Sequence, residues 1–552
     1  MLKKITLAPF SKDDTLFLKG FAILLIVLHN FFRAVNPTTG ENEFWFSGLY
    51  IKKFFIILGN NPMEVFNVVF NFLGHYGVQA FIFISAYGLT LSYQKNRPRY
   101  TSHLLHRLDK LYPSFLIAAV LYILVVILST GRFIDNQTLA DLGIQLSLFA
   151  NFIPDKALSI TGPWWFYSLI FQFYALFPLF MWVVKKFNTR GLVAISILGL
   201  IATVLLYDPM RQVALNPLYL FVGHLPEFCF GILLAVKKEL KLPIWLIALA
   251  LLTFVGGNIF RWMWPIANIS AAILLITLIQ LLIRVKGKMN MVSSFLTFTG
   301  AISMYLFACH GFLRGNFLQL ANYFSSPMAS LVIAVLFVLF AIMLSMAMRQ
   351  VETSVRAWIA TPPSNAGRYL RVASLLLLLT GSVGILYAQN RKALHEDSST
   401  SGKVAFSATN NFEEVGDSPK RYSDSLAFSG HSSFIMQPSE SYSPALEANF
   451  STMNYAEIYR AEASAMLYTT DSLTNAHLVL EVWHVKDGIL MEWKSKDMAA
   501  EELAKGQWQK MVFDYDIPRF YRFPDYKIKV YMWNNSKGQF LVDDLQLTIY
   551  SR

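Results

Sequence analysis

The sequence predicts a polytopic α-helical membrane protein with about eleven transmembrane helices, followed by an all-β domain of the jelly-roll sandwich type. Two observations predict the membrane part. Of the 552 residues, 55% are hydrophobic, and the mean hydropathy of +0.43 exceeds the usual balance of a soluble protein. A third observation predicts the β part, because apolar and polar residues alternate from about residue 405 onward, as they do in strands.

The predicted helices run from the first apolar stretch, residues 18–32, to about residue 388. The chain starts with polar residues and shows no small-residue cleavage site after that stretch, so we expect no cleavable signal peptide. A further half-buried helix is expected around 139–153. The eleven predicted spans lie near 17–35, 72–93, 112–130, 164–184, 190–206, 218–236, 243–260, 266–284, 297–318, 328–347 and 369–388.

Cationic residues gather in alternate loops between these spans. Pairs such as Lys185-Lys186 and Lys237-Lys238 lie on one side, and the opposite side carries only scattered cations. The positive-inside rule therefore predicts a cytoplasmic N-terminus, and an odd number of spans places everything after about residue 388 outside. We expect a multi-pass protein of the bacterial inner membrane whose C-terminal domain lies in the periplasm.

Charge and cysteine content exclude several classes of function. The net charge of +12 comes from basic residues beside hydrophobic segments, which indicates a lipid bilayer as partner and not nucleic acid. The two cysteines, Cys229 and Cys309, lie in apolar segments, so we expect neither a disulfide framework nor a cysteine metal site. No pattern in the sequence indicates an oligomeric state.

The composition changes at Arg391, and the small polar residues of 391–404 predict a linker between a membrane domain, 1–390, and an outer β-sandwich, 405–552. In KIKVYMW, the residues Ile528, Val530 and Met532 share one face, and the residues between them share the other. The segments HLVLEVW, QKMVFDYDI and VDDLQLTIY alternate in the same way, and turn-forming residues separate them.

Polar and ionisable residues interrupt the apolar spans. His29 comes ten residues after Lys19. At about 1.5 Å per residue it lies about 15 Å deeper, near the middle of a hydrocarbon core about 30 Å thick. Such a histidine is either a functional group or a packing residue bonded to a backbone carbonyl. The other unusual residues are Asn30, His75, Gln79, Ser85, His106, Arg107, Asp109, Lys110, Tyr112, Trp164, Trp165, Gln172, Tyr174, His224, Glu227, Ser303, Tyr305 and His310.

Five segments of the membrane part form a recognisable series. In order over about residues 14–350 they are LKGFAILLIVLH, GVQAFIFISAYGL, HRLDKLYP, WFYSLIFQFYALFP and SMYLFACH. The series resembles the acyltransferase-3 family of integral membrane acyltransferases. The resemblance implies transfer of an acyl group, often acetyl, from cytoplasmic acyl-CoA (acetyl-CoA) to a hydroxyl of an envelope glycan, with no tightly bound cofactor and no metal.

The resemblance also implies roles for individual residues. His29 is then the general base that takes the proton of the acceptor hydroxyl, and an acyl-enzyme intermediate stays open as an alternative. Arg107 and Lys110 lie at the cytoplasmic mouth, where cations either bind the phosphates of coenzyme A or anchor the helix end. The further candidates are Asn30, Tyr174 and His310 for catalysis, and Lys19, Ser85, Tyr112, Ser303 and Tyr305 for donor binding.

The sequence departs from the family pattern at several of these positions. Lys19 replaces the usual arginine, and Ala86 replaces the glycine that usually follows the serine. Many members place the histidine eleven residues after the arginine, where this chain has Asn30.

The family's common glutamate in the fourth-span motif is also absent, because Ile170 and Phe171 stand there. A mechanism that needs this carboxylate must take it from elsewhere in the chain. The candidates are Glu43, Glu64 and Glu227.

Two other functions compete with acyl transfer. A transporter or flippase of a lipid-linked glycan predicts paired intramembrane charges or an internal repeat. A catalytically inactive glycan-binding receptor predicts that His29 can be replaced without effect on any product. The outer domain loosely resembles jelly-roll modules of glycan-active proteins, and its aromatic residues either stack on sugars or fill the core; they are Trp483, Trp493, Tyr531 and Trp533.

Overall fold

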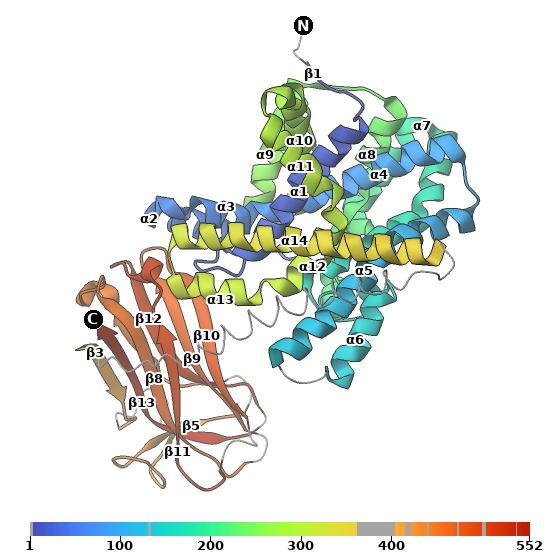
Figure 1. Cartoon of the computed structure of the whole chain (residues 1–552). Coiled ribbons are helices and arrows are strands. Elements are labelled where there is room, and N and C mark those ends of the chain that lie inside the picture. The colour runs from blue at the N-terminus through green and yellow to red at the C-terminus, as the bar shows by residue number, and fades with distance from the viewer. Residues whose placement is uncertain are drawn as a thin grey trace. The chain divides into compact units, whose positions relative to one another are not determined.

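The computed structural model describes residues 4–130, 134–360, 403–413, 421–438, 441–471, 474–499, 504–536 and 538–551. The chain divides into two compact units, Met1–Glu396 and Asp397–Arg552, each described here by itself. The first unit is helical and the second is built from strands (Figure 1). Most of the predicted linker 391–404 and the whole predicted span 369–388 lie outside the described residues, so both stay predictions.

The helices of the first unit are α1 Lys12–Phe32, α2 Gly48–Asn60, α3 Val65–Leu73, α4 Gly77–Asn96, α5 Tyr100–Thr130, α6 Asn136–Leu146, α7 Trp165–Gln212, α8 Leu225–Lys237, α9 Ile244–Ile259, α10 Trp264–Val285, α11 Asn290–Ala301, α12 Ser303–Leu313, α13 Gly315–Phe324 and α14 Pro327–Ala360. Two short strands, β1 Lys4–Leu7 and β2 Leu240–Pro243, pair antiparallel. The helix expected around 139–153 corresponds to α6 and a short 3-10 turn at Ala150–Phe152.

The first unit is a multi-pass helical membrane protein, but the count of eleven spans is not confirmed. A seventh crossing results if α11 and α12, which are bent by 79°, count as one broken span. Among the described residues, six helical segments are long and apolar enough to cross a membrane: Lys12–Phe32, Pro62–Asn96, Tyr100–Ser129, Gly162–Gln212, Trp264–Lys288 and Pro327–Trp358.

The difference has two sources. Two predicted spans, 164–184 and 190–206, both fall in the segment Gly162–Gln212, which forms one of the six although α7 consists of two helices that meet at a kink at Asn188, with φ 53° and ψ −153°. Two others, 218–236 and 243–260, correspond to α8 and α9, which have 13 and 16 residues. A straight helix needs about 20 residues to cross about 30 Å of hydrocarbon, so these two are short.

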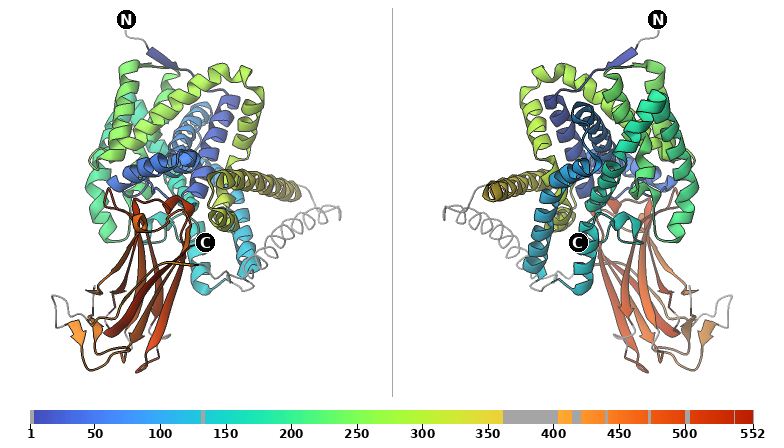
Figure 2. Two further views of the ribbon diagram at one scale, coloured as in Figure 1. Left: turned by 90° about the vertical axis from the view of Figure 1, so that its left-hand side faces the viewer. Right: turned by 90° about the vertical axis from the view of Figure 1, so that its right-hand side faces the viewer.

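The first unit is built around α1. The side chain of Ser11 and that of Asp14 form a capping box that fixes where the helix begins. The helices α3, α4, α11, α12 and α14 pack against it (Figures 1 and 2). Gly20 allows the close contact with α11, because a Cβ there would lie only 1.8 Å from the Leu296 carbonyl oxygen.

A second glycine positions the chain beside the other end of α1. Between α3 and α4 the chain makes one 3-10 turn, Gly74–Tyr76. A Cβ on Gly74 would lie 2.7 Å from the Cβ of His29 and 2.9 Å from the carbonyl oxygen of Leu25. Only glycine therefore lets this turn pass so close to His29.

The second unit is an antiparallel β-sandwich, as predicted, and its strands run lengthwise through it (Figure 2). One sheet has the order β10-β9-β12-β6, with β7 also paired to β12, and the other has the order β11-β8-β13-β5-β4, with β3 also paired to β13. The strands are β3 Lys403–Asn410, β4 Tyr422–Ser423, β5 Ser433–Met436, β6 Ser441–Tyr442, β7 Leu446–Asn449, β8 Ile458–Tyr468, β9 Asn475–His484, β10 Ile489–Ala499, β11 Gln509–Asp516, β12 Tyr526–Asn534 and β13 Phe540–Ser551.

The core of the sandwich follows the predicted alternation. Ile528, Val530 and Met532 on β12 are fully buried, and the residues between them are half-buried. On β13, Leu545 and Leu547 are buried in the same way. Apolar burial on this scale is what stabilises a sandwich of two sheets.

Candidate active site

His29 lies near the C-terminal end of α1, and only 2% of its surface is exposed. Its Nδ1 lies 3.1 Å from the carbonyl oxygen of Phe70 in α3. Because a carbonyl oxygen can only accept a hydrogen bond, Nδ1 carries the hydrogen, and Nε2 of the neutral ring then has the free lone pair. Nε2 has no hydrogen-bond partner among the described residues. One nitrogen therefore packs against the backbone, and the other is available for chemistry.

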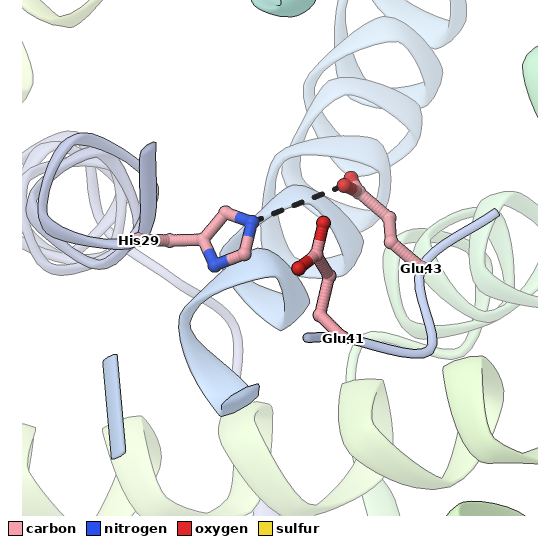
Figure 3. Close-up of side chains that lie close together, drawn as sticks. All are labelled: His29, Glu41 and Glu43. Carbon is pink, nitrogen blue, oxygen red and sulfur yellow. Dashed lines mark ion pairs between the residues drawn. The ribbon is translucent and has the colours of Figure 1, made fainter. Parts of the chain in front are cut away.

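Glu43 faces this free nitrogen. Its Oε2 lies 4.0 Å from Nε2 of His29 (Figure 3). This separation is too long for a direct hydrogen bond, but a hydroxyl oxygen can lie about 2.8 Å from Nε2 and donate its single hydrogen to that atom. The sequence offered three glutamates in place of the family's missing carboxylate. Of these three, Glu43 is the one that lies beside the histidine.

The loop that carries Glu43 is held by side chains from distant parts of the chain. Nε1 of Trp264 donates to the carbonyl oxygen of Asn42 at 2.6 Å. The Tyr207 hydroxyl and the Asn216 amide both donate to the carbonyl oxygen of Phe44, at 3.0 and 2.8 Å. These buried bonds satisfy the loop backbone, and so they fix the carboxylate relative to α1.

The charges around the loop are partly balanced. Nη2 of Arg33 lies 2.6 Å from Oε1 of Glu41, which forms an ion pair at the end of α1. Burial raises the pKa of Glu43 to about 8, against the opposite effect of Arg33. Arg314 donates to the carbonyl oxygen of Asn30 and so satisfies the end of the helix.

A cavity of about 20 Å³ adjoins the histidine and the glutamate. It is lined by His29, Asn30, Glu43, His75 and Trp165, among others. A cavity of this size holds about one water molecule. A substrate must therefore displace side chains to reach Nε2.

The same residues could hold a metal ion. Nε2 of His29 and carboxylate oxygens of Glu41 and Glu43 lie within 4.8 Å of one another, and these are ligand types that zinc accepts. The guanidinium of Arg33, however, already pairs with Glu41 and would repel a cation. The arrangement suits a histidine–carboxylate pair better than a metal site.

Two other predicted catalytic residues lie close to this site in the fold. Asn30 lines the cavity, although its amide donates to the carbonyl oxygen of Ile26 at 3.0 Å. His310 is fully buried in α12, and its Nδ1 lies 3.0 Å from the carbonyl oxygens of Leu306 and Phe307. Its Nε2 has no partner among the described residues, but His310 does not line the cavity.

The predicted donor-binding cations lie toward the opposite end of α1. Lys19 is in the first half of the helix, and its charge is close enough to Lys110 on α5 for the two to repel each other. Arg107 donates through Nη2 to Ser92 at 3.2 Å, and its Nε has no partner among the described residues. The structure thus separates these predicted donor-binding cations from the end of α1 that holds His29, Arg33 and Arg314.

The remaining predicted residues have other contacts. The Tyr112 hydroxyl donates to the carbonyl oxygen of Leu146 at 2.9 Å, and the Tyr305 hydroxyl donates to Glu352 at 2.8 Å. Tyr174 accepts a hydrogen bond from His103 at 3.1 Å through its backbone carbonyl. Ser85 is half-buried in α4, and Ser303 is buried at the start of α12. Their roles in donor binding or catalysis stay predictions.

Two functional candidates did not emerge from the sequence, namely Arg33 and Glu41. The signal that could have found them is ENEFWF, where two glutamates stand among aromatic residues directly after the first span. Of the other glutamates considered, Glu64 accepts a hydrogen bond from Asn67 at 3.2 Å, and Glu227 is buried in α8. Neither lines the cavity beside His29.

The fold and the site together define a multi-pass membrane protein with a buried histidine–carboxylate pair at one end of its first long helix and cations at the other. Residues 17–349 match the acyltransferase-3 profile, an acyltransferase domain, and the chain belongs to this family. The match covers more than half of the chain and confirms the resemblance inferred from the five motifs. No curated protein matches the chain.

Several solved carbohydrate-binding modules are similar to part of the chain. The xylan-binding domain of Paenibacillus barcinonensis Xyn10C is 14% identical over 28% of this chain and 99% of that one, with a TM-score of 0.19. The C-terminal family 22 module of Clostridium thermocellum Xyn10B is 16% identical over 26% of this chain and 92% of that one, also with a TM-score of 0.19. The CBM22-1-GH10 modules of Clostridium thermocellum Xyn10B are 13% identical, and the alignment spans only 24% of that chain and 26% of this one, with a TM-score of 0.18.

Proposed function

We propose that this protein is an O-acyltransferase that moves an acyl group, with acetyl expected, from cytoplasmic acyl-CoA to a hydroxyl of a cell-envelope polysaccharide or lipid-linked glycan. The observation that carries the proposal is the free Nε2 of His29, fixed by Phe70 on one side and facing Glu43 across 4.0 Å. Membership of the acyltransferase-3 family supports the reaction class.

In the proposed reaction, the acceptor hydroxyl lies against Nε2 of His29. Nε2 of His29 takes its proton, and the oxygen forms an ester bond with the acyl carbon. The carbon–sulfur bond of the thioester breaks, and the coenzyme A thiolate leaves and receives a proton through water. The imidazolium that forms is stabilised by the Glu43 carboxylate, and general base catalysis of this kind contributes about 10²- to 10⁴-fold. An acyl-enzyme intermediate would divide the transfer into two such steps.

The two ends of the first unit support separate roles, with the acyl donor bound at one end and the acyl transfer at the other. Coenzyme A is too highly charged to cross hydrocarbon, so its phosphates stay at the cation-rich end near Lys19, Arg107 and Lys110. Only the acyl group then has to reach His29. The proposal places the cation-rich end in the cytoplasm and the Glu43 loop outside, in agreement with the positive-inside rule.

The test compares the envelope glycans of three strains by mass spectrometry: wild type, a deletion, and His29→Ala with its expression confirmed. We expect one acyl unit to be lost from each modified sugar in both mutants. Full acylation in the His29→Ala strain but not in the deletion would show that the chemistry lies elsewhere in the chain. Unchanged acylation with reduced glycan export in the deletion would favour a transporter, and retained glycan binding with no acylated product in any strain would favour an inactive receptor.

One sheet face of the second unit favours a second role, glycan binding. On the sheet β10-β9-β12-β6, the carboxylate of Glu481 accepts hydrogen bonds from Trp483 at 2.7 Å and from Tyr531 at 2.8 Å. Trp493 and Trp533 lie on the same face with their rings 6.2 Å apart, and Trp493 is 42% exposed. Exposed aromatic rings beside fixed polar groups are suited to stacking on sugars. Co-sedimentation of the full chain with insoluble cell-wall polysaccharide should therefore be lost in Trp493→Ala, with acyl transfer to a soluble acceptor unchanged.

A further inference from the structure

A second pocket lies next to the loop that carries Glu43. Its volume is about 290 Å³, and we call it the Trp45 pocket. It is lined by Trp45, Asn151, Asp155, Arg211 and Tyr219, together with smaller residues. These residues come from the connections after α1, between α6 and α7, and after α7, and Arg211 comes from the last turn of α7.

The Trp45 pocket and the cavity beside His29 share a wall. Leu158 lines both of them. The ring of Tyr219 lies 4.6 Å from that of Phe44 and 6.1 Å from that of Trp165, and both of these residues line the cavity. One layer of side chains therefore separates a ligand in the pocket from His29.

Asn151 gives the pocket an unused hydrogen-bond acceptor. Its side chain is fully buried, and its amide donates to the carbonyl oxygens of Trp165 and Tyr219 at 2.9 and 2.6 Å. Its Oδ1 has no partner among the described residues. This oxygen is shielded from solvent, so a ligand hydroxyl reaches it only after a wall residue such as Tyr219 moves, and the bond would then recover the free energy that the unpaired acceptor costs.

The backbone of the pocket wall is also unusual. Asp155 and Ala214 both have left-handed backbone angles, with φ of 58° and 56°. The two residues are joined by a hydrogen bond of 3.2 Å from the Asp155 amide to the Ala214 carbonyl. Residues other than glycine that adopt left-handed angles cost free energy, and they are common at ligand sites. This pair is therefore consistent with a pocket wall that is shaped for a ligand.

The mixture of groups indicates the kind of ligand. Trp45 is 40% exposed and offers an aromatic face. Asp155 and Arg211 are exposed and bring opposite charges. Asp155 would repel a phosphate or carboxylate, whereas it accepts hydrogen bonds from a neutral ligand with several hydroxyls.

We propose that the Trp45 pocket binds the acceptor sugar, with one ring face on Trp45 and its hydroxyls on Asp155 and Arg211. This inference rests on the proposed function, because it names where the acceptor of that reaction sits. Ligand pockets start at about 300 Å³, so the pocket suits about one sugar residue. Movement of Tyr219 or Leu158 would open the way from the pocket to Nε2 of His29.

The test uses the full chain in lipid nanodiscs with acetyl-CoA and a panel of methyl hexosides and methyl N-acetylhexosaminides as acceptors. Mass spectrometry of the acetylated glycoside gives kcat and KM. We expect Trp45→Ala and Asp155→Asn each to raise KM about tenfold with kcat unchanged, the size expected for one lost contact of this kind. Asparagine tolerates left-handed angles, so Asp155→Asn preserves the backbone.

The matched control is Trp262→Ala, which removes a tryptophan that is 75% exposed and lies outside the pocket, and which should keep the wild-type KM. Saturation-transfer NMR then measures glycoside binding to His29→Ala, which should bind normally without turnover. Wild-type KM values in both pocket variants would overturn the pocket and leave the proposed function standing. Glycoside binding that depends on Trp45, with no transfer by any form of the protein, would overturn the proposed function and leave the pocket standing. The absence of saturable glycoside binding to the wild type would overturn the pocket.

Discussion

Each of the two units contains a buried histidine beside a carboxylate, and the two pairs differ in how completely they are satisfied. In the β-sandwich, Nδ1 of His477 lies 2.7 Å from Asp497, and its Nε2 lies 2.9 Å from Asn535. In the membrane unit, His29 has one backbone partner, and its Nε2 faces Glu43 across 4.0 Å. Both histidine side chains are buried, so burial alone does not distinguish them.

The difference lies in the surroundings of the second nitrogen. His477 and Asp497 are cross-strand partners on β9 and β10, and the carboxylate is 58% exposed to water. Both ring nitrogens of His477 are therefore bonded within the fold, and the remaining oxygen of Asp497 bonds to water. Glu43 is only 12% exposed, and a loop held from three directions keeps it away from direct contact with His29. The free lone pair on Nε2 of His29 can therefore accept a hydrogen bond from a reacting hydroxyl.

The largest effect that tests this comparison is expected from Glu43→Gln, which should reduce kcat by about 10²-fold. Because burial raises the pKa of Glu43 to about 8, this carboxyl is mostly protonated at pH 7 and ionises as the pH rises. Only the ionised form stabilises the imidazolium. The rate of the wild type should therefore rise with pH and level off above about 8, and this limb should be absent in Glu43→Gln. The measurement is the pH dependence of acyl transfer in nanodiscs.

A metal site would give a different result in the same assay. If His29, Glu41 and Glu43 held a divalent cation, a chelator would abolish wild-type activity, and added zinc would restore it. We expect a chelator to have no effect, because Arg33 pairs with Glu41. Loss of activity on chelation would replace the histidine–carboxylate pair with a metal centre.

A smaller effect is expected from Gly74→Ala, which changes no chemical group of the site. The added methyl group would lie 2.7 Å from the Cβ of His29, so α1 or the turn must shift. A shift of a few tenths of an ångström at a catalytic group should lower kcat about tenfold. Gly59→Ala on α2 is the matched control, because a Cβ there has no heavy atom within 4 Å. Equal rates in the two variants would show that the position of His29 is not critical.

Sequence patterns predicted the parts of this molecule that depend on local periodicity. The strands of the sandwich follow from the alternation of apolar and polar residues. The position of His29 within α1 follows from one long apolar run. Glu43 appeared only as one of three glutamates, and Arg33 and Glu41 did not appear at all. The placement of the Glu43 loop depends on Tyr207, Asn216 and Trp264, which are more than 150 residues away in the chain. Such contacts have no local signature.

The count of eleven spans stays unconfirmed for a related reason. Hydropathy identified the apolar segments correctly, but it does not show where a helix begins. The predicted span 218–236 contains 3-10 turns up to His224, which leave α8 only 13 residues. The predicted spans 164–184 and 190–206 correspond to the two helices of α7, and the kink that joins them is visible only in the backbone angles of Asn188.

The smallest effect on activity is expected from His477→Ala, which tests the satisfied pair. The substitution leaves Asp497 and Asn535 without their shared partner and removes a ring that lies 4.8 Å from that of Trp533. Because Asp497 is 58% exposed and can bond to water instead, the sandwich should lose only ~1 kcal/mol of unfolding free energy. Tryptophan fluorescence during thermal unfolding of the full chain measures this loss, and the rate of acyl transfer to a soluble glycoside should equal that of the wild type. A fall in that rate to the level of His29→Ala would mean that a satisfied histidine–carboxylate pair also takes part in the reaction, and the distinction between the two units would no longer hold.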